Sequence, residues 1–570
     1  MYDAAGNVTR MSDYLGVTSY GYDAAGRLVS RTRNGKTVAY SYAVNGQVAA
    51  IDYWGRGAVT YGYDGAGQLT SLSPWGQAST NYSYRSTGIL ASQSRPHGVS
   101  TAYGYDSASR LTRLLHATGG GTLQDIQYVL DANGNRMQMS DGDGLTTYAY
   151  DALNRLTQVE LPAMPTGPPS QTIAYGLDAV GNRISDSAAS YAYDASDRLT
   201  NAGFSYDANG NLLGDGQKQY QYDGANRLTR VISGTLTVEY GYDGWGNLVL
   251  EQSGGITTEF VLDELSLLPL LLGEVRSDGV ERLYAYGPDG FAAQRTLTLG
   301  GGDEMAYPLL DGLGSIRHLT DATGVVILSR SYDAFGALRH ASGSGITRLG
   351  FTGELVDPHT GLIYLRARHY HPVLGRFLQR DTFAGFAARG QSRNRYAYAE
   401  NNPANLTDPS GHCVGVLGGA DTVICAAAVS AAAGAAMGAA TEYGFQVYQN
   451  YQNGLRGGAM FTQNLNWRRI GMSAVGGAVG GLAGKPTHVH DYLHPTPIVY
   501  IPRSSEFKKP PIEERFTTIR HQLEAHYEEA AEFLRDDGQL AARLQKYRDT
   551  LKQLNEKRLK LMYEYYRKQP

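Results

Sequence analysis

The amino-acid sequence predicts a mainly β protein in which short hairpins stack into a spiralling sheet or partial shell, followed by a small α-helical C-terminal region. The phrase Tyr-Asp-x-x-Gly-x-Leu recurs through residues 1–255, and a fixed period of this kind indicates a repeat architecture. The 570 residues include 71 Gly and 42 Tyr but only 13 Phe and 4 Trp, which favours strands and turns. Apolar residues at helical spacing near the C-terminus predict the helices.

Each copy of the phrase predicts one β-hairpin. Alternating residues such as Tyr40-Ser41-Tyr42 suit a strand with one aromatic face. The aspartate then accepts hydrogen bonds from the backbone amides that follow it, and glycine takes the positive φ of a tight turn. No hairpin buries its apolar face alone, so the copies have to stack, with a ladder of tyrosines on the inside. We assign no catalytic role to the repeats. Copies of the phrase and its variants begin at Tyr22, Tyr63, Tyr105, Tyr150, Tyr193, Tyr206, Tyr222 and Tyr242.

Composition limits what the chain binds. Lys and Arg number 50 against 54 Asp and Glu, so the net charge is −4, and the shell offers no cationic field for nucleic acid. The two cysteines, Cys413 and Cys425, lie too late in the chain to crosslink the long region before them. The first residues lack the basic and apolar stretches of a signal peptide and open inside a repeat, which suggests an internal start. No cofactor is predicted.

The repeat phrase resembles that of Rhs/YD-repeat proteins, which include the C components of insecticidal Tc toxins and the YD shell of teneurins. The resemblance implies a spiralling β-sheet that closes into a hollow shell and, in bacterial members, encloses a C-terminal toxin. Residues 1–255 then form the repeats of the shell, and residues 256–412 resemble the Rhs repeat-associated core domain that plugs it. The motifs that carry the second resemblance are Asp311–Arg317, Ser331–Gly336, Phe351–Glu354, Gly361–Tyr370, Gly375–Phe377, Asn401–Pro403 and Asp408–His412.

In self-cleaving members of this family, an arginine and two aspartates of the core motifs act as an internal aspartyl protease. Matched motif to motif, the resemblance assigns these roles to Arg368, Asp381 and Asp408 and sets the cut between His412 and Cys413. The residue types suit the chemistry, because two carboxylates held close cannot both ionise. One of them keeps a proton as general acid while the other activates water. A guanidinium, which keeps its charge, can hold the ionised partner.

Other interpretations of these residues stay open. The segment Asp408-Pro409-Ser410-Gly411 is also a favourable turn, and Arg368 could form an ordinary ion pair. His412 stands where the family usually has leucine, and His371 replaces a usual aspartate. A histidine beside the cut could add pH sensitivity or could be a tolerated substitution.

Composition changes after the core, and residues 413–484 are rich in Ala and Gly. Two parts of this region, 423–440 and 470–484, consist largely of small and apolar residues. Small residues at such spacings let helices touch closely. We favour a pre-toxin linker or packed cargo for this region. The alternative is a membrane-active segment, in which the two parts contact a bilayer as candidate transmembrane helices.

Residues 485–570 combine a proline-rich linker with a predicted helical hairpin and form the variable C-terminal effector. Apolar residues follow helical spacing from Phe516 to Phe533 and again from Leu540 to Leu561. The linker holds three histidines that are weak candidates for metal ligands, but their spacing matches no familiar motif, so no metal is assigned. These are His488, His490 and His494.

The favoured hypothesis is a Rhs-type polymorphic toxin, used in competition between cells, whose shell carries an effector that aspartyl autoproteolysis releases. The resemblance implies a secreted or cell-surface protein, an immunity protein that binds the C-terminal tail, and an upstream shell or secretion partner. One alternative is a cell-surface adhesion protein whose YD shell binds glycans or proteins without any cleavage. Another is a displaced C-terminal fragment of a longer Rhs protein.

Overall fold

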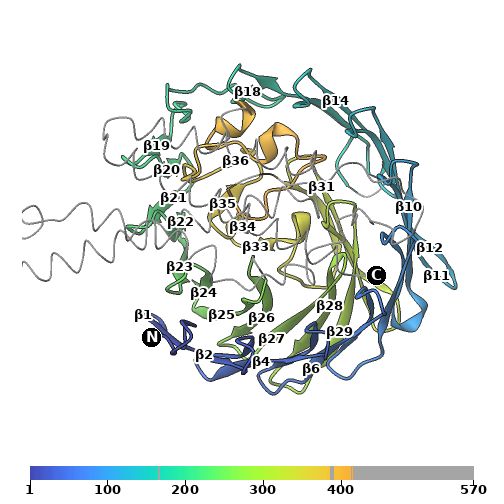
Figure 1. Cartoon of the computed structure of the whole chain (residues 1–570). Helices are drawn as coiled ribbons and strands as arrows, with labels where there is room; N and C mark the ends of the chain where they lie inside the picture. The colour runs from blue at the N-terminus through green and yellow to red at the C-terminus, as the bar shows by residue number, and fades with distance from the viewer. Residues whose placement is uncertain (165–166, 267, 386–389, 413, 415–570) are drawn as a thin grey trace, which may run out of the picture. The chain divides into compact units, whose positions relative to one another are not determined.

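The computed structural model describes residues 1–164, 167–266, 268–385, 390–412 and 414 (Figure 1). They all belong to the first of two compact units, Met1–Val499, and the second unit is Tyr500–Pro570. Strands and turns make up nearly all of the described residues, which confirms the predicted mainly β fold. Apart from Val414, the predicted pre-toxin region 413–484 and effector region 485–570 lie outside the described residues, so both assignments stay predictions.

The described strands form four sheets, and in each sheet the strands pair antiparallel in the order of the sequence. The first sheet has 16 strands, and a two-stranded sheet follows it. The strands of these two sheets are β1 (Arg10–Asp13), β2 (Gly16–Tyr22), β3 (Leu28–Arg33), β4 (Lys36–Tyr42), β5 (Val48–Tyr53), β6 (Ala58–Tyr63), β7 (Leu69–Pro74), β8 (Thr80–Tyr84), β9 (Leu90–Ser94), β10 (Ser100–Tyr105), β11 (Leu111–Thr118), β12 (Gly121–Leu130), β13 (Arg136–Asp141), β14 (Gly144–Tyr150), β15 (Leu156–Leu161) and β16 (Gln171–Ala174), then β17 (Gly176–Leu177) and β18 (Arg183–Ser185).

The third sheet has 14 strands and the fourth has four. The strands of the third sheet are β19 (Phe204–Tyr206), β20 (Leu212–Asp215), β21 (Gln219–Tyr222), β22 (Leu228–Ser233), β23 (Leu236–Tyr242), β24 (Leu248–Ser253), β25 (Ile256–Asp263), β26 (Leu270–Arg276), β27 (Glu281–Gly287), β28 (Gly290–Leu297), β29 (Asp303–Leu310), β30 (Ile316–Asp321), β31 (Val326–Tyr332) and β32 (Leu338–Gly343). The fourth sheet contains β33 (Leu355–Val356), β34 (Ile363–Leu365), β35 (Arg368–His371) and β36 (Arg376–Phe377). The described 3₁₀ helices are η1 (Pro96–Gly98), η2 (Phe351–Gly353), η3 (Gly390–Arg393) and η4 (Ala399–Asn401).

The repeat aspartate closes the turn between two strands. After β2, Asp23 Oδ1 accepts hydrogen bonds from the N–H groups of Ala25 and Arg27, both at 2.9 Å, and Asp23 Oδ2 accepts one from Arg27 Nε at 2.7 Å. The side chain four residues after such an aspartate can reach the next turn, as Arg155 Nη1 does when it donates to Asp178 O at 2.8 Å. Neighbouring turns are thereby linked. In other copies too, the aspartate accepts a hydrogen bond from the side chain of an Arg or Asn four residues later. These aspartates are Asp106, Asp131, Asp151, Asp178, Asp194, Asp207, Asp223 and Asp243.

The repeat tyrosine ties each copy to the copy before it. Tyr42 Oη donates to Leu28 O at 2.6 Å, and Leu28 is the first residue of β3. The tyrosine of one phrase therefore satisfies the carbonyl of the apolar residue that ends the previous phrase, which fixes the register between copies. The same bond joins Tyr63 to Val48, Tyr84 to Leu69, Tyr105 to Leu90 and Tyr242 to Leu228.

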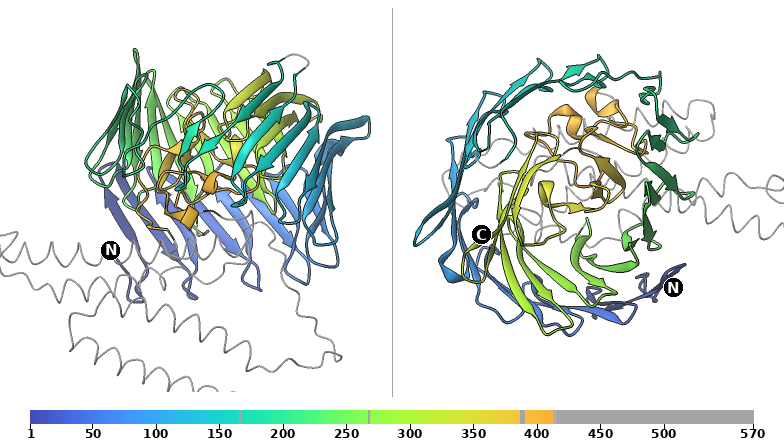
Figure 2. Two further views of the ribbon diagram at one scale, coloured as in Figure 1. Left: turned by 90° about the horizontal axis from the view of Figure 1, so that it is seen from above. Right: turned by 180° about the vertical axis from the view of Figure 1, so that it is seen from behind.

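The strands of this unit wind so that later strands lie on the inner side of earlier ones (Figures 1 and 2). Strands β25 to β29 share one buried apolar cluster with strands β3 to β9. Tyr40, Tyr61 and Tyr82 belong to this cluster, and they form a ladder on the inner face, as the repeat pattern predicts. Tyr40 Oη also donates to Asp263 Oδ1 of β25 at 3.0 Å. The inner face of β3 to β9 is therefore covered by later strands of the same chain.

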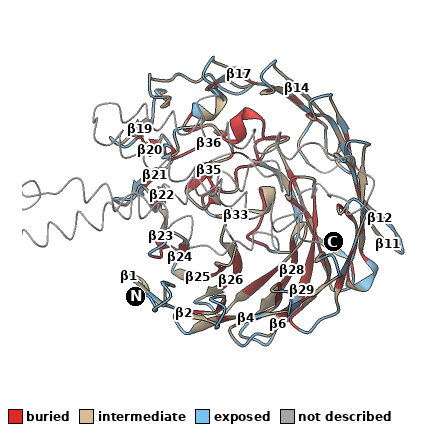
Figure 3. Cartoon of the chain, in the orientation of Figure 1, coloured by how far each residue is buried: buried red, intermediate tan, exposed pale blue. Residues whose placement is uncertain are grey.

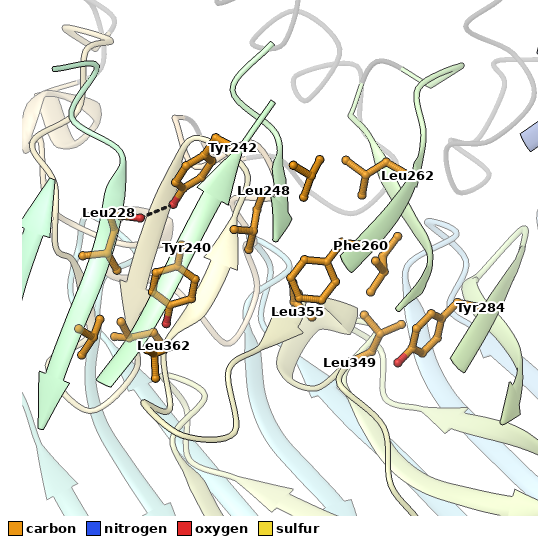
Figure 4. Close-up of a cluster of buried hydrophobic side chains, with 14 of the residues drawn as sticks. Leu228, Tyr240, Tyr242, Leu248, Phe260, Leu262, Tyr284, Leu349, Leu355 and Leu362 are labelled. Carbon is orange, nitrogen blue, oxygen red and sulfur yellow. Dashed lines mark hydrogen bonds between the residues drawn. The ribbon is translucent and has the colours of Figure 1, made fainter. Parts of the chain in front are cut away.

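Residues 344–385 and 390–412 lie inside the curve of the strands (Figures 1 and 2), and we call them the core segment. Its leucines Leu349, Leu355 and Leu362 belong to the same buried cluster as Tyr240 and Phe260 of the third sheet (Figure 4). The inner strands and the core segment hold many of the buried residues (Figure 3). The core segment thus covers the inner face that the third sheet leaves open.

Asparagines of the core segment fasten it to the turns of the outer strands. They lie at the end of η4 and directly after it, and the three residues of η4, Ala399, Glu400 and Asn401, all have positive φ, between 47° and 61°. Such a left-handed turn costs free energy and persists where surrounding contacts hold it. The bonds run from Asn401 Nδ2 to Gly181 O at 2.8 Å, from Asn402 Nδ2 to Asn135 Oδ1 at 3.2 Å, and from the Arg136 N–H to Asn405 Oδ1 at 2.8 Å.

Burial keeps several histidines neutral where the layers meet. It lowers the pKa of His116 to about 3 and the pKa of His318, His369 and His371 to about 4. The His369 ring lies 5.2 Å from the ring of Tyr240, measured between centroids. In an unfolded chain an imidazole takes up its proton near pH 6.5, so the unfolded state binds more protons than the folded state between pH 6.5 and about 4. Acidification through this range therefore weakens the fold.

We predict that His369→Phe removes part of this acid sensitivity. The phenyl ring keeps the aromatic packing and has no proton to gain. The wild-type chain should lose about 2 kcal/mol more unfolding free energy than the variant between pH 7.5 and pH 5, because one buried imidazole has to stay neutral. Urea unfolding of both proteins, followed by intrinsic fluorescence at the two pH values, measures the difference. Equal losses in the two proteins would show that His369 is not held neutral by burial.

Candidate active site

The three residues that the sequence singled out for catalysis lie on different parts of the core segment. Arg368 is the first residue of β35, directly after a turn in which Arg366 has a positive φ of 56°. Asp381 follows β36, and Asp408 opens the turn that leads to His412. The exposed fractions of Arg368, Asp381 and Asp408 are 5%, 6% and 4%, so water hardly reaches their charged groups. At this burial, an ionised group needs a partner of opposite charge.

The fold brings these three side chains together. Arg368 Nη2 lies 2.6 Å from Asp381 Oδ2 and 3.6 Å from Asp408 Oδ2, so one nitrogen faces both carboxylates. Arg368 also donates from Nη1 to Arg395 O at 2.8 Å. Its guanidinium carbon lies 3.6 Å from the centroid of the Phe377 ring, which supports the group from one side. Arg368 is thus held by several fixed contacts.

Hydrogen bonds hold the chain just before the expected cut against Arg368 and the turn that precedes it. The Arg368 Nε donates to Gly411 O, and the Ala367 N–H donates to Ser410 O at 3.3 Å. One residue earlier, Arg366 Nη1 donates to Pro409 O at 2.7 Å. These bonds fix the path of the backbone up to residue 411.

His412 contacts both aspartates. Its backbone N–H donates to Asp408 Oδ1 at 3.1 Å and lies at the same distance from Ser410 Oγ. Its ring nitrogen Nδ1 lies 2.7 Å from Asp381 Oδ1. Ser410 Oγ in turn donates to Asp408 Oδ1 at 3.1 Å. The residue on the N-terminal side of the expected cut is therefore held directly against the carboxylate pair.

The electrostatics of the site favour one protonated carboxyl group. Burial raises the pKa of Asp408, and the positive charge of Arg368 acts in the opposite direction. Burial also lowers the pKa of Arg368, a change that the two carboxylates oppose. One guanidinium cannot neutralise two buried carboxylates, so a proton on Asp408 balances the charge while Asp381 keeps the close ion pair. An acid and a base side by side are what peptide hydrolysis by aspartates requires.

Sequence reasoning missed several residues that build the site. It did not identify the Phe377 ring under Arg368, the Arg395 carbonyl that Arg368 Nη1 bonds, or the pair of Arg366 Nη1 with Glu354 Oε2 at 2.6 Å. It noted His412 as a departure but not that its ring reaches Asp381. The close spacing of Arg366 to Arg368 was the available signal, since two arginines beside an apolar strand require acceptors.

Some predicted sites lie outside the described residues. These are Cys413, the segments 423–440 and 470–484, and the histidines His488, His490 and His494. Within the described part of the chain, no group of His, Cys, Asp or Glu side chains is arranged to hold a metal ion. No helix among those same residues is long and apolar enough to cross a membrane.

Family models of known proteins match two parts of the chain. The Teneurin YD-shell model matches residues 124–404, and the RHS Repeat model matches residues 2–38. Together these matches extend over more than half of the chain, including all strands of the third sheet and most of the core segment.

Several curated proteins are similar in sequence. The tRNA nuclease WapA of Bacillus subtilis is 28% identical over 297 residues, which are 51% of this chain and 11% of that protein. The double-stranded DNA deaminase toxin A of Burkholderia cenocepacia is 30% identical over 162 residues, covering 25% of this chain and 11% of that one. The toxin protein Tse5 of Pseudomonas aeruginosa is 32% identical over 107 residues, covering 19% and 8%. The chain thus spans about a tenth of the length of these relatives.

Solved structures of Tc toxins share the fold. The crystal structure of TcdB2-TccC3-Cdc42 matches 72% of this chain and 24% of that chain, with a TM-score of 0.61 and 20% identity. The Tc holotoxin pore of Photorhabdus luminescens matches 71% of this chain and 24% of that chain, with a TM-score of 0.60 and 19% identity. The likeness shows that the spiral of hairpins around a core segment is a shared architecture.

We predict that Gly411→Ala loosens the segment that carries the expected cut. Gly411 has a φ of 71°, and an added Cβ would lie 2.2 Å from Leu365 O, so the backbone has to move. A cost of about 2 kcal/mol corresponds to roughly 30-fold faster amide exchange in residues 404–412. Hydrogen exchange with mass spectrometry measures this rate.

The matched control for this variant is Gly361→Ala. Gly361 has nearly the same φ, 72°, but an added Cβ there meets nothing within 4 Å. The control should leave exchange at residues 404–412 unchanged. If both variants speed exchange there equally, the strap around Gly411 does not hold the segment.

Proposed function

The chain belongs to the Rhs/YD-repeat family, and on that premise we propose that it is the shell and core of a polymorphic toxin that cuts its own chain after His412. The single observation that carries the proposal is the convergence of Arg368, Asp381 and Asp408 on the segment that ends at residue 412. In this proposal the released part is the effector, which begins at Cys413. One cut per chain is sufficient for release.

The proposed reaction is a hydrolysis by an acid and a base. The ionised Asp381 takes a proton from water, and the water oxygen attacks the carbonyl carbon of His412. The protonated Asp408 gives its proton to the amide nitrogen of Cys413 as the carbon–nitrogen bond breaks. The products are a carboxylate at His412 and an amine at Cys413. Arg368 holds Asp381 in place and balances its negative charge through the 2.6 Å ion pair.

The relatives support a toxin in which a shared shell carries different effectors. Their names include a tRNA nuclease, a double-stranded DNA deaminase toxin and a further toxin, and each is similar to this chain over about a tenth of its own length. We propose by analogy that this chain is delivered outside the producing cell, that an immunity protein binds its C-terminal tail, and that an upstream shell or secretion partner acts with it.

A second candidate function is a cell-surface YD-shell protein that binds glycans or proteins. The observation in its favour is similarity to two animal proteins. Teneurin-m of Drosophila melanogaster is 26% identical over 115 residues, covering 20% of this chain and 4% of that protein. Salivary gland surface protein 1 of Aedes aegypti is 30% identical over 202 residues, covering 31% and 6%. Such a protein needs no cleavage, and neither does a displaced fragment of a longer Rhs protein. Whether the folded chain is cut or whole therefore separates these candidates from the self-cleaving toxin.

We predict that the purified wild-type chain consists of two fragments, residues 1–412 and 413–570, while Asp408→Asn stays whole. An amide in place of Asp408 has no proton of suitable acidity for the leaving amine. The loss of one general acid or base slows such a reaction by roughly 10²- to 10⁴-fold. Asp381→Asn should behave in the same way, because it removes the base. Intact mass under denaturing conditions reports both forms directly.

The matched control is Asp357→Asn. Asp357 is another aspartate of the core segment with an exposed fraction of 5%, but it bonds Tyr240 rather than the site. This variant should be cut like the wild type. A wild-type chain that keeps its full mass of 61.7 kDa would contradict the proposal. Equal cleavage in Asp408→Asn would contradict the role of that residue.

A further inference from the structure

We infer that His412 is a positioning residue that restrains its own cleavage: its imidazole holds the Asp381 oxygen that water has to use, and the cut waits for this contact to be given up. The inference rests on the proposed self-cleavage and adds a control to it.

Both oxygens of Asp381 are already occupied. Oδ2 pairs with Arg368 Nη2 at 2.6 Å, and Oδ1 lies 2.7 Å from His412 Nδ1. Oδ1 also accepts a hydrogen bond from the Phe383 N–H at 2.8 Å. A water molecule that is to lose a proton to Asp381 needs one of these oxygens within hydrogen-bond distance. The His412 ring is the one of these partners that can turn away without breaking the backbone or the Arg368 ion pair.

The charges of the site explain why the imidazole competes with catalysis. Arg368 carries one positive charge, while Asp381 and Asp408 carry two negative charges when both are ionised. Neutrality therefore requires one further proton, and either Asp408 or His412 can hold it. Only the form with the proton on Asp408 has both an acid and a free base. When the proton is on His412, the imidazolium is drawn onto Asp381 and Asp408 has no proton to give.

Other charged groups near the site do not replace His412 in this role. Arg366 pairs with Glu354 at 2.6 Å and donates to Pro409 O at 2.7 Å. Arg395 donates from Nη1 to the Asp381 carbonyl at 3.1 Å rather than to its carboxylate. Tyr398 is buried, and burial raises its pKa, so its hydroxyl stays neutral. The proton that moves in the site is thus shared between His412 and Asp408.

The inference gives an effect with a definite sign. Without the imidazole, Asp381 Oδ1 keeps the Phe383 N–H and can receive a water molecule, while the Arg368 ion pair on Oδ2 stays in place. Cleavage should therefore be faster when the imidazole is removed, whereas the loss of a merely supporting contact would slow it.

The test compares the wild type with His412→Leu and His412→Gln. Uncut chains, solubilised in urea from inclusion bodies, are diluted into one refolding buffer, and the cut fraction is followed by mass after denaturing quenches. Tryptophan fluorescence in parallel gives the rate of refolding. We expect both variants to refold at the wild-type rate and His412→Leu to be cut about tenfold faster than the wild type.

Further variants make the outcomes distinguishable. His359→Leu removes an exposed histidine of the core segment and should be cut at the wild-type rate. Asp408→Asn gives the uncut baseline. A merely structural role of His412 would leave both variants cut at or below the wild-type rate, and that result overturns the inference while the proposed cleavage stands. If no chain is cut, the proposed function fails and the inference fails with it.

Discussion

A β-hairpin leaves one apolar face in water, and the hairpins of this chain cover that face with residues far away in the sequence. The buried cluster that joins β3–β9 to β25–β29 contains Val38 and Leu72 of the first sheet beside Leu272 and Leu283 of the third. Each such side chain contributes about 1.5–3 kcal/mol when it leaves water completely. The strands of one turn of the spiral are therefore stable only when strands of the next turn of the spiral, or the core segment, pack against them. The spiral and its contents form a single cooperative structure, and the position of the core segment is a consequence of this requirement.

Much of the local structure could be predicted from the sequence because its causes are local. The Asp-x-x-Gly phrase determines the turn, since the aspartate bonds amides two and four residues on and glycine takes positive φ. The contacts between turns of the spiral have no such local signal. Arg31 Nε pairs with Glu264 Oε1 at 2.7 Å across 233 positions of sequence, and this pair depends on how many hairpins make one turn. Two turns also depart from the phrase, because Trp54 and Trp75 take positive φ where glycine or asparagine is usual.

The residues of the candidate site also divide into those that the sequence could predict and those that depend on the fold. Motif matching identified Arg368, Asp381 and Asp408. The fold brings both carboxylates to the guanidinium of Arg368. The contact of His412 with Asp381 could not be predicted, because it depends on the left-handed turn at Gly411 and on the bonds that strap residues 409–411 to the turn before Arg368. The sequence could indicate that His412 was unusual, but only the geometry gives it a partner and therefore a chemical role. The same holds for the ring of Phe377, which lies in another motif and supports Arg368 from below.

The site and the spiral are connected by the core segment, which is both the inner cover of the sheet and the support for the carboxylate pair. A chain that folds completely therefore also assembles its acid and base, and cleavage would mark the end of folding. Analysis of the chain termini after folding in water enriched in ¹⁸O tests this account most directly. The account predicts one new C-terminus, at His412, that carries heavy oxygen from the solvent, and one new N-terminus, at Cys413. Peptides that run uncut through residues 412 and 413, or new termini at another position, would contradict it.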